Sequence, residues 1–405
     1  MRTRLIPLLV LSFLAASCSV FGPEDARVLR ALTADESSVV EADNRFGLRL
    51  FGTLSAETPE ANVFISPLSV SMALGMTLNG AAGETRAAME RTLALHGLTP
   101  EQINQAYHGL IDLLRGLDPD VLFYLANSIW YRQGVPVEPA FLETNRTYFD
   151  AEVAALDFAN PASVDVINRW VDTRTRGTIE QIIDQISPDV VLYLINAIYF
   201  KGTWRYAFDP SDTHEAPFHN LDGSTSMVPM MRLDADLDVV HAGDVRAVEL
   251  PYGYGHYAMT LVLPGDDLPL DSLVARLDAT TWADWTSRLT KVPSVTVYLP
   301  RFKVEYREEL STVLRALGMG EAFDPSAADF SGIHASGGLY LSGVFHKTFV
   351  DVDEKGTEAA AVTAVEVRET SVGHDAVFRF DRPFLYLIRE RHSGTILFVG
   401  KMVRM

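Results

Sequence analysis

The sequence predicts an α+β fold: one large domain with large mixed or antiparallel β-sheets. Helical patterns dominate the first half of the chain, and most strand patterns follow later. Beyond about residue 36, no linker rich in proline, glycine or serine and no repeat divides the chain. Helices and strands that are segregated along a chain are typical of α+β folds.

The N-terminus has the pattern of a targeting segment. Arg2 and Arg4 precede a short apolar stretch that ends in small residues, which is typical of a secretory signal peptide over residues 1–17. Cys18 is the only cysteine and follows directly, in a sequence similar to a bacterial lipobox. We therefore expect lipidation of Cys18, a tether over residues 18–36 and a folded domain over residues 37–405. The alternative is an ordinary signal peptide that contains a cysteine.

The expected location of the protein follows from this segment. An exported chain with a lipid on Cys18 would be held at the cell envelope, at the outer membrane or the cell surface, and without the lipid it would be secreted. The apolar stretch is too short to span a bilayer. The membrane is therefore expected as a partner through the lipid anchor only.

The first elements of the domain are predicted to be helices. Apolar residues from Val39 to Phe51 give a first helical pattern. Ser66 and Pro67 then predict the start of a second helix, because serine caps a helix N-terminus and proline suits the first turn.

Strands are predicted from apolar runs. Val121–Leu125 and Val191–Ile195 are continuous apolar runs, which is typical of strands buried on both faces. Tyr257–Leu263, Val295–Leu299 and Ile396–Val399 give further strands.

Composition and motifs exclude several function classes. The chain has 405 residues, 48% hydrophobic and 21% charged, which excludes a disordered protein. Its formal charge of −19 repels phosphate backbones, so no nucleic-acid partner is expected. The chain has no Gly-x-Ser-x-Gly, phosphate-loop or His-Glu-x-x-His motif, and its ten histidines are scattered singly. We expect no catalytic residues, no cofactor and no metal site.

The segment from Asp353 to Thr370 has an unusual pattern. Alternate residues from Thr357 to Val367 are small or β-branched and uncharged, whereas the intervening positions carry the charges. This alternation predicts a strand with one buried face. The alanine-rich centre equally favours a helix, so the segment is poised between conformations. An ordinary strand or helix of small residues is the alternative.

Six sequence blocks, in the same order and at compatible spacings, make the chain resemble the serpin family. The resemblance runs over nearly the whole chain after the signal segment. The blocks are Asn62 to Ser69, Asn168 to Ile179, Asn196 to Trp204, Leu299 to Lys303, Asp353 to Ala361, and Asp381 to Leu385.

The resemblance implies a serpin-like domain with about eight or nine helices and an exposed reactive-centre loop. It implies a suicide inhibitor of serine proteases, or of cysteine proteases. In the family, the protease cleaves the loop, whose N-terminal part then inserts into the main sheet and traps the acyl-enzyme. A target protease is thus the implied partner, and we expect the inhibitor to be a monomer.

The resemblance also assigns roles to residues. The loop hinge maps to Glu354, Gly356, Thr357, Glu358, Ala359, Ala360 and Ala361. Insertion requires a hinge without bulk or charge on its inward face, and Gly356 is expected to give the bend conformational freedom. The buried polar "shutter", where strands part, maps to Ser66, Ser69, Asn196 and His346, and the "breach", where insertion begins, maps to Trp204.

The scissile bond is assigned by counting along the loop. Counting forward from Glu354 places it at Thr370–Ser371, whereas counting back from the Asp381 block places it at Val372–Gly373. We prefer the forward count, because the inserted length governs distortion of the enzyme. A threonine bait suits an elastase-like or subtilisin-like protease. Arg368 and Glu369 would serve trypsin-like or Glu-specific enzymes if the register slips.

Two alternative functions stay open. The chain could be a serpin-fold binding protein that is cleaved as a substrate without trapping the enzyme, or an exported hydrolase of unrelated fold. The hinge carries no charge on its inward face, which argues against the first, and the absence of a nucleophile motif argues against the second.

Overall fold

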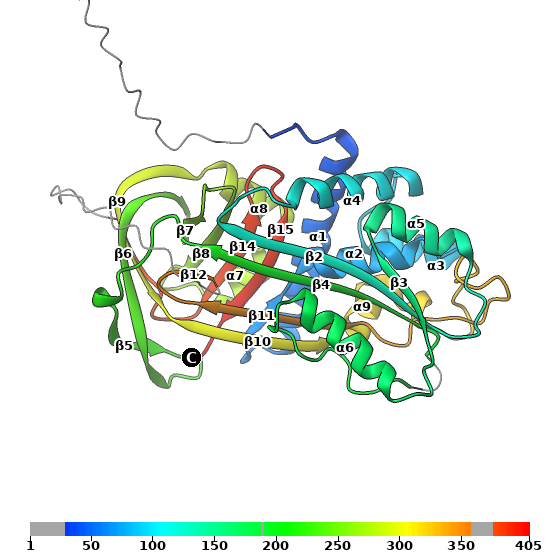
Figure 1. The fold of residues 1–405 in the computed structure, drawn as a ribbon. Helices are drawn as coiled ribbons and strands as arrows, with labels where there is room; N and C mark the ends of the chain where they lie inside the picture. Colours follow the sequence, from blue (N-terminus) through cyan, green and yellow to red (C-terminus); the bar gives the residue numbers. More distant parts are fainter. Residues whose placement is uncertain (1–28, 188–189, 358–375) are drawn as a thin grey trace, which may run out of the picture. The chain divides into compact units, whose positions relative to one another are not determined.

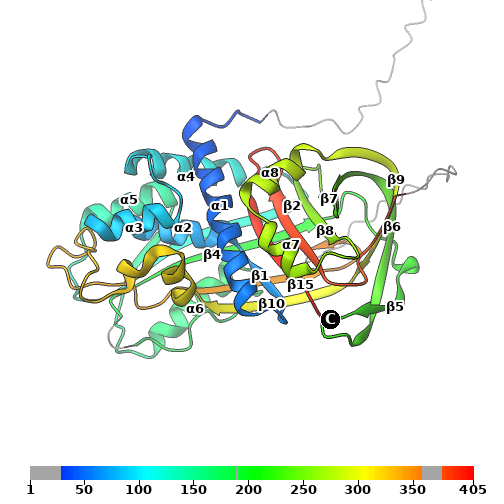
Figure 2. The same cartoon turned by 180° about the vertical axis from the view of Figure 1, so that it is seen from behind.

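The structure, a computed structural model, describes residues 29–187, 190–357 and 376–405. Its compact unit Ala31–Met405 combines a nine-stranded sheet, a six-stranded sheet and, among the described residues, nine α-helices (Figures 1 and 2). The predicted α+β class is confirmed. The helices are α1 (Ala34–Glu57), α2 (Pro67–Leu78), α3 (Gly83–Thr92), α4 (Pro100–Leu114), α5 (Pro139–Phe149), α6 (Ala162–Arg174), α7 (Leu270–Arg276), α8 (Ala279–Ser287) and α9 (Ser311–Leu314).

The six-stranded sheet is mostly antiparallel. Its strand order is β10 (Phe302–Glu309), β11 (Phe345–Val352), β12 (Gly356–Thr357), β4 (Leu192–Thr203), β2 (Val121–Arg132) and β3 (Glu152–Leu156). Only the β2–β3 pair is parallel. The second member of the sheet, β11, is therefore joined to β4 through a strand of only two residues.

The nine-stranded sheet forms much of the core. Its order is β1 (Val63–Ile65), β15 (Ile396–Met402), β14 (Phe384–Glu390), β8 (Tyr257–Pro264), β7 (Val245–Tyr252), β6 (Thr225–Ala242), β9 (Thr290–Pro300) and β13 (Val377–Arg379), with β5 (His214–His219) on β6. Every residue of β8, β14 and β15 is buried. Burial of so much apolar surface stabilises the fold in a chain with a single cysteine.

The first two helices begin with side-chain caps. The Thr33 hydroxyl accepts a hydrogen bond from the Glu36 amide, and the Glu36 carboxylate accepts one from the Thr33 amide, so α1 begins at Ala34. Helix α1 therefore includes the last residues of the segment 18–36, which was expected to be a tether. Ser66 caps α2 as predicted, and Pro67 occupies its first turn.

The burial expected for two strands is wrong. Val121–Leu125 lies in β2 and Val191–Ile195 overlaps β4, but Tyr124 is 40% exposed and residues 191–194 are only half-buried. The reason is coverage: α2 packs on one face of this sheet, whereas the opposite face is covered only in part, by α6 and the chain that follows it (Figures 1 and 2).

Two further findings bear on function. In the described part of the chain, no helix is long and apolar enough to span a membrane. Asn145 of the Asn-x-Thr sequence in α5 is fully buried and donates to the Phe141 and Met76 carbonyls. Its amide is therefore inaccessible to glycosylation in the folded chain.

Candidate functional site

The predicted hinge begins in a tight turn after β11. The Asp353 carboxylate accepts hydrogen bonds from the Lys355 amide at 2.8 Å and the Gly356 amide at 3.1 Å. The Asp353 amide donates to the Gly356 carbonyl at 3.0 Å. These three bonds reverse the chain, so that β12 returns alongside β11.

Strand β12 is wedged between β11 and β4. Thr357 pairs with Val352 on one side and with Gly202 on the other, and Gly356 pairs with Thr203. Within the described residues, β11 and β4 share no strand pairing with each other. The start of the predicted loop thus already occupies a sheet position, whereas the resemblance implies a loop held outside the sheet before cleavage.

The expected role of Gly356 is corrected by its surroundings. Its backbone does not adopt a positive φ, so conformational freedom is not what the position requires. A Cβ at Gly356 would lie 2.0 Å from the Gly202 carbonyl oxygen and 2.9 Å from the Thr203 Cα. Glycine is needed because β12 approaches the backbone of β4 too closely for any side chain.

Thr357 is anchored by an aromatic pair. Its side chain is 2% exposed, and its hydroxyl lies 2.6 Å from the buried Tyr252 hydroxyl. The Trp204 ring stacks on Tyr252 with ring centres 4.4 Å apart. Trp204 also donates from its indole nitrogen to the Asp353 carbonyl and from its amide to the Lys355 carbonyl. The predicted breach residue therefore holds the hinge turn directly.

Glu354 is held by a bidentate ion pair. The Arg301 guanidinium donates to both carboxylate oxygens at 2.6–2.8 Å, and the Thr213 hydroxyl donates at 2.6 Å. Burial alone would raise the pKa of Glu354, but these hydrogen bonds outweigh it and lower the pKa. Glu354 is therefore charged at neutral pH and fixes the hinge turn onto Arg301.

The predicted shutter residues lie together beneath the sheet. The Ser66 amide donates to His346 Nε2 at 3.1 Å, and the Ser66 hydroxyl donates to the Leu397 carbonyl at 2.7 Å. Ser69 donates from its amide to Ser66 Oγ and, at 3.5 Å, from its hydroxyl to the Asn196 carbonyl. Burial lowers the pKa of His346 to about 4, so the imidazole is neutral and its Nε2 is free to accept.

Asn196 extends this cluster to a residue that the sequence reasoning missed. Its amide donates to Asn127 Oδ1 at 2.6 Å, and Asn127 donates to the Phe149 carbonyl at 2.7 Å. The cluster thus connects β11, β4, β2, α2 and the end of α5.

A cavity of about 140 Å³ lies beside this cluster, between β4 and β11, which do not pair with each other. It is lined by residues 190–196, by residues 338–346 and by residues of α2. The chain after α6 contributes Ile182 and Ile183. The space next to the missing strand pairing is therefore partly empty and mostly apolar.

The far end of the loop is anchored on the other sheet. Strand β13 pairs in parallel with β9, and the Thr296 amide donates to the Ala376 carbonyl at 3.0 Å. The Arg379 guanidinium lies 3.7 Å from the centre of the Tyr298 ring. The segment between Thr357 and Ala376 is thus attached at both ends.

Several predicted site residues lie outside the described part of the chain. They are Cys18, Glu358, Ala359, Ala360, Ala361, Arg368, Glu369, Thr370, Ser371, Val372 and Gly373. Among the residues that are described, no group of three or more histidine, cysteine, aspartate or glutamate side chains could hold a metal.

The sequence identified only some of the residues that contact the hinge. Arg301 stands in one of the six sequence blocks, but its pairing with Glu354 was not predicted. Thr213 and Tyr252 lie outside the blocks, because their roles arise from contacts distant in sequence.

Comparison with known proteins gives a consistent result. The family model described as "Serpin (serine protease inhibitor)" matches residues 41–405. Iripin-2 of Ixodes ricinus is 36% identical over 376 residues, which cover 91% of this chain and 94% of that protein.

Solved structures are similar as well. The thermophilic serpin tengpin in its native state has a TM-score of 0.85 and 30% identity, and the match covers 93% of this chain and 96% of tengpin. Human thyroxine-binding globulin, solved with its hormone, has a TM-score of 0.82 and 29% identity, with 92% and 99% covered.

Proposed function

Because the chain belongs to the serpin family, we propose that it inhibits serine proteases by a suicide mechanism. A target protease cleaves the segment between Thr357 and Ala376 and becomes acylated on it. The N-terminal part of the cut segment then inserts as a full strand between β11 and β4. Insertion displaces the enzyme and distorts its active site before water can release the acyl group.

The observation that carries this proposal is the position of β12. Gly356 and Thr357 already pair with β4, and Thr357 also pairs with β11, where these two strands share no pairing of their own. Continuing β12 along the same line would add a strand between two unpaired edges. Its backbone groups and those of both neighbours would gain hydrogen bonds, and its inward side chains would be buried.

The hinge chemistry supports the same mechanism. Thr357 is buried and uncharged, and the next positions with the same alternation, Ala359 and Ala361, are small. Charged Glu358 falls on the opposite face and would stay in water. A hinge of this kind can enter the sheet quickly, which matters because insertion must outrun deacylation.

The reactive bond is proposed to be Thr370–Ser371. This assignment places fourteen residues, from Thr357 to Thr370, in the inserted strand. A threonine bait favours an elastase-like or subtilisin-like target, and trypsin-like enzymes are the second choice. We propose that the inhibitor acts as a monomer, lipid-anchored through Cys18 at the cell envelope.

A second candidate function is a binding protein of the same fold that is cleaved without trapping. The similarity to thyroxine-binding globulin favours it, because that protein was solved in complex with thyroxine. A family member with this fold can therefore bind a small molecule.

The deciding experiment mixes the purified protein with elastase-like, subtilisin-like and trypsin-like proteases. Products are separated on denaturing gels and their intact masses are measured. We expect a complex that survives denaturant and has the summed mass of inhibitor and enzyme less that of the released peptide, which begins at Ser371. Cleavage by every enzyme without any such complex would favour the binding protein.

A further inference from the structure

Strand β10 is the end strand of the six-stranded sheet, so one of its edges is free. Among the described strands it pairs only with β11, and Figure 1 shows it along the rim of the sheet. Within the described residues, no backbone hydrogen bond joins positions 302–309 to any segment other than β11. An edge of eight residues with unpaired amide and carbonyl groups can pair with a strand of another chain.

The outward side chains of this strand alternate in charge. Lys303, Glu305, Arg307 and Glu309 are exposed, whereas the residues between them are buried or half-buried. Proteins often place charges on an edge strand to prevent association. The alternation here has a further consequence, because an antiparallel strand of the same sequence would oppose each charge with one of opposite sign.

The charges select one register for such a pair. A twofold axis that passes through Tyr306 places Lys303 opposite Glu309 in the second copy. The same axis places Glu305 opposite Arg307. Each pair occurs twice, and opposite charges that face each other across two strands stabilise their pairing. Moving the axis by one residue in either direction would place like charges opposite each other.

Two of these charges lack an ion-pair partner in the described part of the chain. The Lys303 ammonium lies 4.8 Å from the centre of the Phe349 ring and pairs with no described carboxylate. The Glu309 carboxylate accepts hydrogen bonds from the Ser311 and Val344 amides, both at 3.1 Å, and from the Ser311 hydroxyl. None of these donors carries a charge. The twofold axis brings the two unpartnered charges opposite each other.

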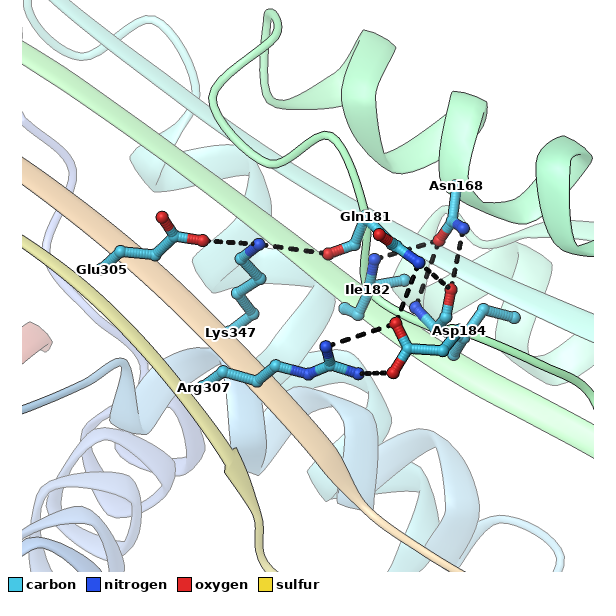
Figure 3. A network of polar contacts seen from close by, with 8 residues as sticks. Asn168, Gln181, Ile182, Asp184, Glu305, Arg307 and Lys347 are labelled. Atoms are coloured by element: carbon cyan, nitrogen blue, oxygen red, sulfur yellow. Dashed lines mark hydrogen bonds and ion pairs between the residues drawn. The ribbon is translucent and has the colours of Figure 1, made fainter.

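The other two charges have partners and still remain accessible. Glu305 pairs with Lys347 at 2.7 Å, and Arg307 donates to Asp184 at 2.7 Å (Figure 3). The Glu305 and Arg307 side chains are nevertheless 59% and 44% exposed. The hydrogen bond from Lys347 lowers the pKa of Glu305, so this carboxylate is charged at neutral pH. A carboxylate and a guanidinium each have room for further hydrogen bonds, so both can pair across the axis.

The residue at the axis is aromatic. Tyr306 shares the inward face of β10 with the buried Phe302 and Val304, but it is only half-buried. At the axis its ring would lie beside the same ring of the second copy. Because aromatic pairs across two strands are stabilising, burial of Tyr306 would add to the charge complementarity.

We propose that two copies of this chain associate through the free edge of β10, in the antiparallel register centred on Tyr306. The interface is self-complementary, as in most twofold dimers. It lies on the far side of β11 from the space between β11 and β4, and each chain keeps its own hinge. One chain therefore remains the inhibiting unit, and the dimer goes beyond the function proposed above.

The association is expected to be weak in solution. Two edge strands bury less surface than a typical stable interface, and exposed ion pairs contribute little and are screened by salt. Attachment of both chains to one membrane would raise their effective concentration and favour the dimer. The experiment therefore needs a readout that captures a weak contact.

The direct test is disulfide cross-linking of the full-length protein that carries Cys18→Ala, so that no natural cysteine remains. The variant Lys303→Cys with Glu309→Cys should form a dimer linked by two disulfides on mild oxidation, because opposite residues of paired strands lie within disulfide reach. The matched controls carry Lys303→Cys or Glu309→Cys alone. Each should stay monomeric at the same protein concentration, since the two copies of residue 303 lie about 20 Å apart along the strands.

A charge swap tests the register without cysteines. Arg307→Glu should weaken the dimer about tenfold in sedimentation equilibrium, because it turns two attractive pairs into repulsive ones. Adding Glu305→Arg should restore the dimer. The doubly substituted chain should pair with itself and not with the wild type, because a mixed dimer would again oppose like charges.

The outcomes are decisive for the dimer. Cross-linking of the double-cysteine variant and not of the single variants would support the register. Absence of cross-linking in every variant, with unchanged melting temperatures, would show that the charged edge keeps chains apart and would overturn the proposal. Equal cross-linking of single and double variants would overturn it as well. None of these results bears on protease trapping, which needs one chain only.

Discussion

The hydroxyl groups of Tyr252 and Thr357 lie 2.6 Å apart, and both side chains are buried. The bond joins the last described residue of the hinge to β7 of the other sheet. It fixes the point at which the reactive segment leaves the six-stranded sheet. A buried hydroxyl group that loses its hydrogen-bond partner costs free energy. This hydrogen bond is therefore expected to persist only while Thr357 stays in the sheet.

The Thr357→Arg substitution should displace the hinge from its position in the sheet. Thr357→Arg would place a charge where the wild-type side chain is 2% exposed and would leave the Tyr252 hydroxyl without its partner. The loop should still be cut, but the protein should behave as a substrate, with a stoichiometry of inhibition at least tenfold higher. Titration of the target protease measures this value.

Thr357→Ser is the matched control, because it keeps the hydroxyl and the small volume. It should inhibit with nearly wild-type stoichiometry. Equal inhibition by the arginine and serine variants would count against entry of this residue into the sheet.

Loss of the Glu354 charge should weaken the hinge turn. Glu354→Gln keeps the shape but removes the bidentate ion pair with Arg301. The free energy of unfolding of the intact protein should fall by about 1.5–3 kcal/mol, the range for hydrogen bonds to charged groups. Urea unfolding of Glu354→Gln, Arg301→Gln and the double variant measures it, and fully additive losses would show that the pair is not coupled.

The hinge and shutter predictions rest on signals that are local or shared across the family, and the four predicted shutter residues lie in one hydrogen-bonded cluster. The alternation after Thr357 and the six blocks are visible in the chain itself. The role of Gly356 was misjudged, because the close approach of the Gly202 carbonyl comes from a strand about 150 residues away. Contacts of this kind leave no pattern in the sequence.

Strand burial shows a second limit. The continuous apolar runs in β2 and β4 gave no sign that one sheet face is only partly covered. Coverage depends on where α6 and the chain that follows it lie, which is a property of the whole fold. The sequence likewise did not predict that Gly356 and Thr357 already lie in the sheet as β12. Their position involves contacts with Tyr252 and Trp204, which are distant in sequence.

His346 should make stability fall in mild acid. Its folded pKa of about 4 lies below the ordinary value of 6.5, so the unfolded chain takes up a proton first. This contribution is complete above about pH 6.5 and is lost as the pH falls toward 4, by roughly 3 kcal/mol. The His346→Gln variant should not show this loss when the free energy of unfolding in urea is compared between about pH 6.5 and pH 4.

Asp43 should have the opposite effect on how the stability depends on pH. Burial raises its pKa to about 7, against the hydrogen bond that the Tyr107 hydroxyl donates to its carboxylate, so the folded protein keeps its proton longer than the unfolded chain. This contribution is complete below about pH 4 and is lost as the pH rises toward 7. Asp43→Asn should therefore gain stability relative to the wild type as the pH rises, and a constant difference between the two would contradict the raised pKa.

Cys18 should decide where the protein is found. Cys18→Ala removes the thiol that would carry the lipid, so the variant should move from the membrane to the soluble fraction after cell lysis. Immunoblotting of both fractions measures the change. Continued retention of the variant in the membrane would show that the lipid is not what holds it there.

The central claim is that the cut loop becomes a strand between β4 and β11. The most direct test compares thermal unfolding of the intact protein with that of the protein cleaved once in the loop. Pairing of up to thirteen further residues, 358–370, on two edges should raise the melting temperature by more than about 10 °C. An unchanged or lower melting temperature after cleavage would contradict insertion.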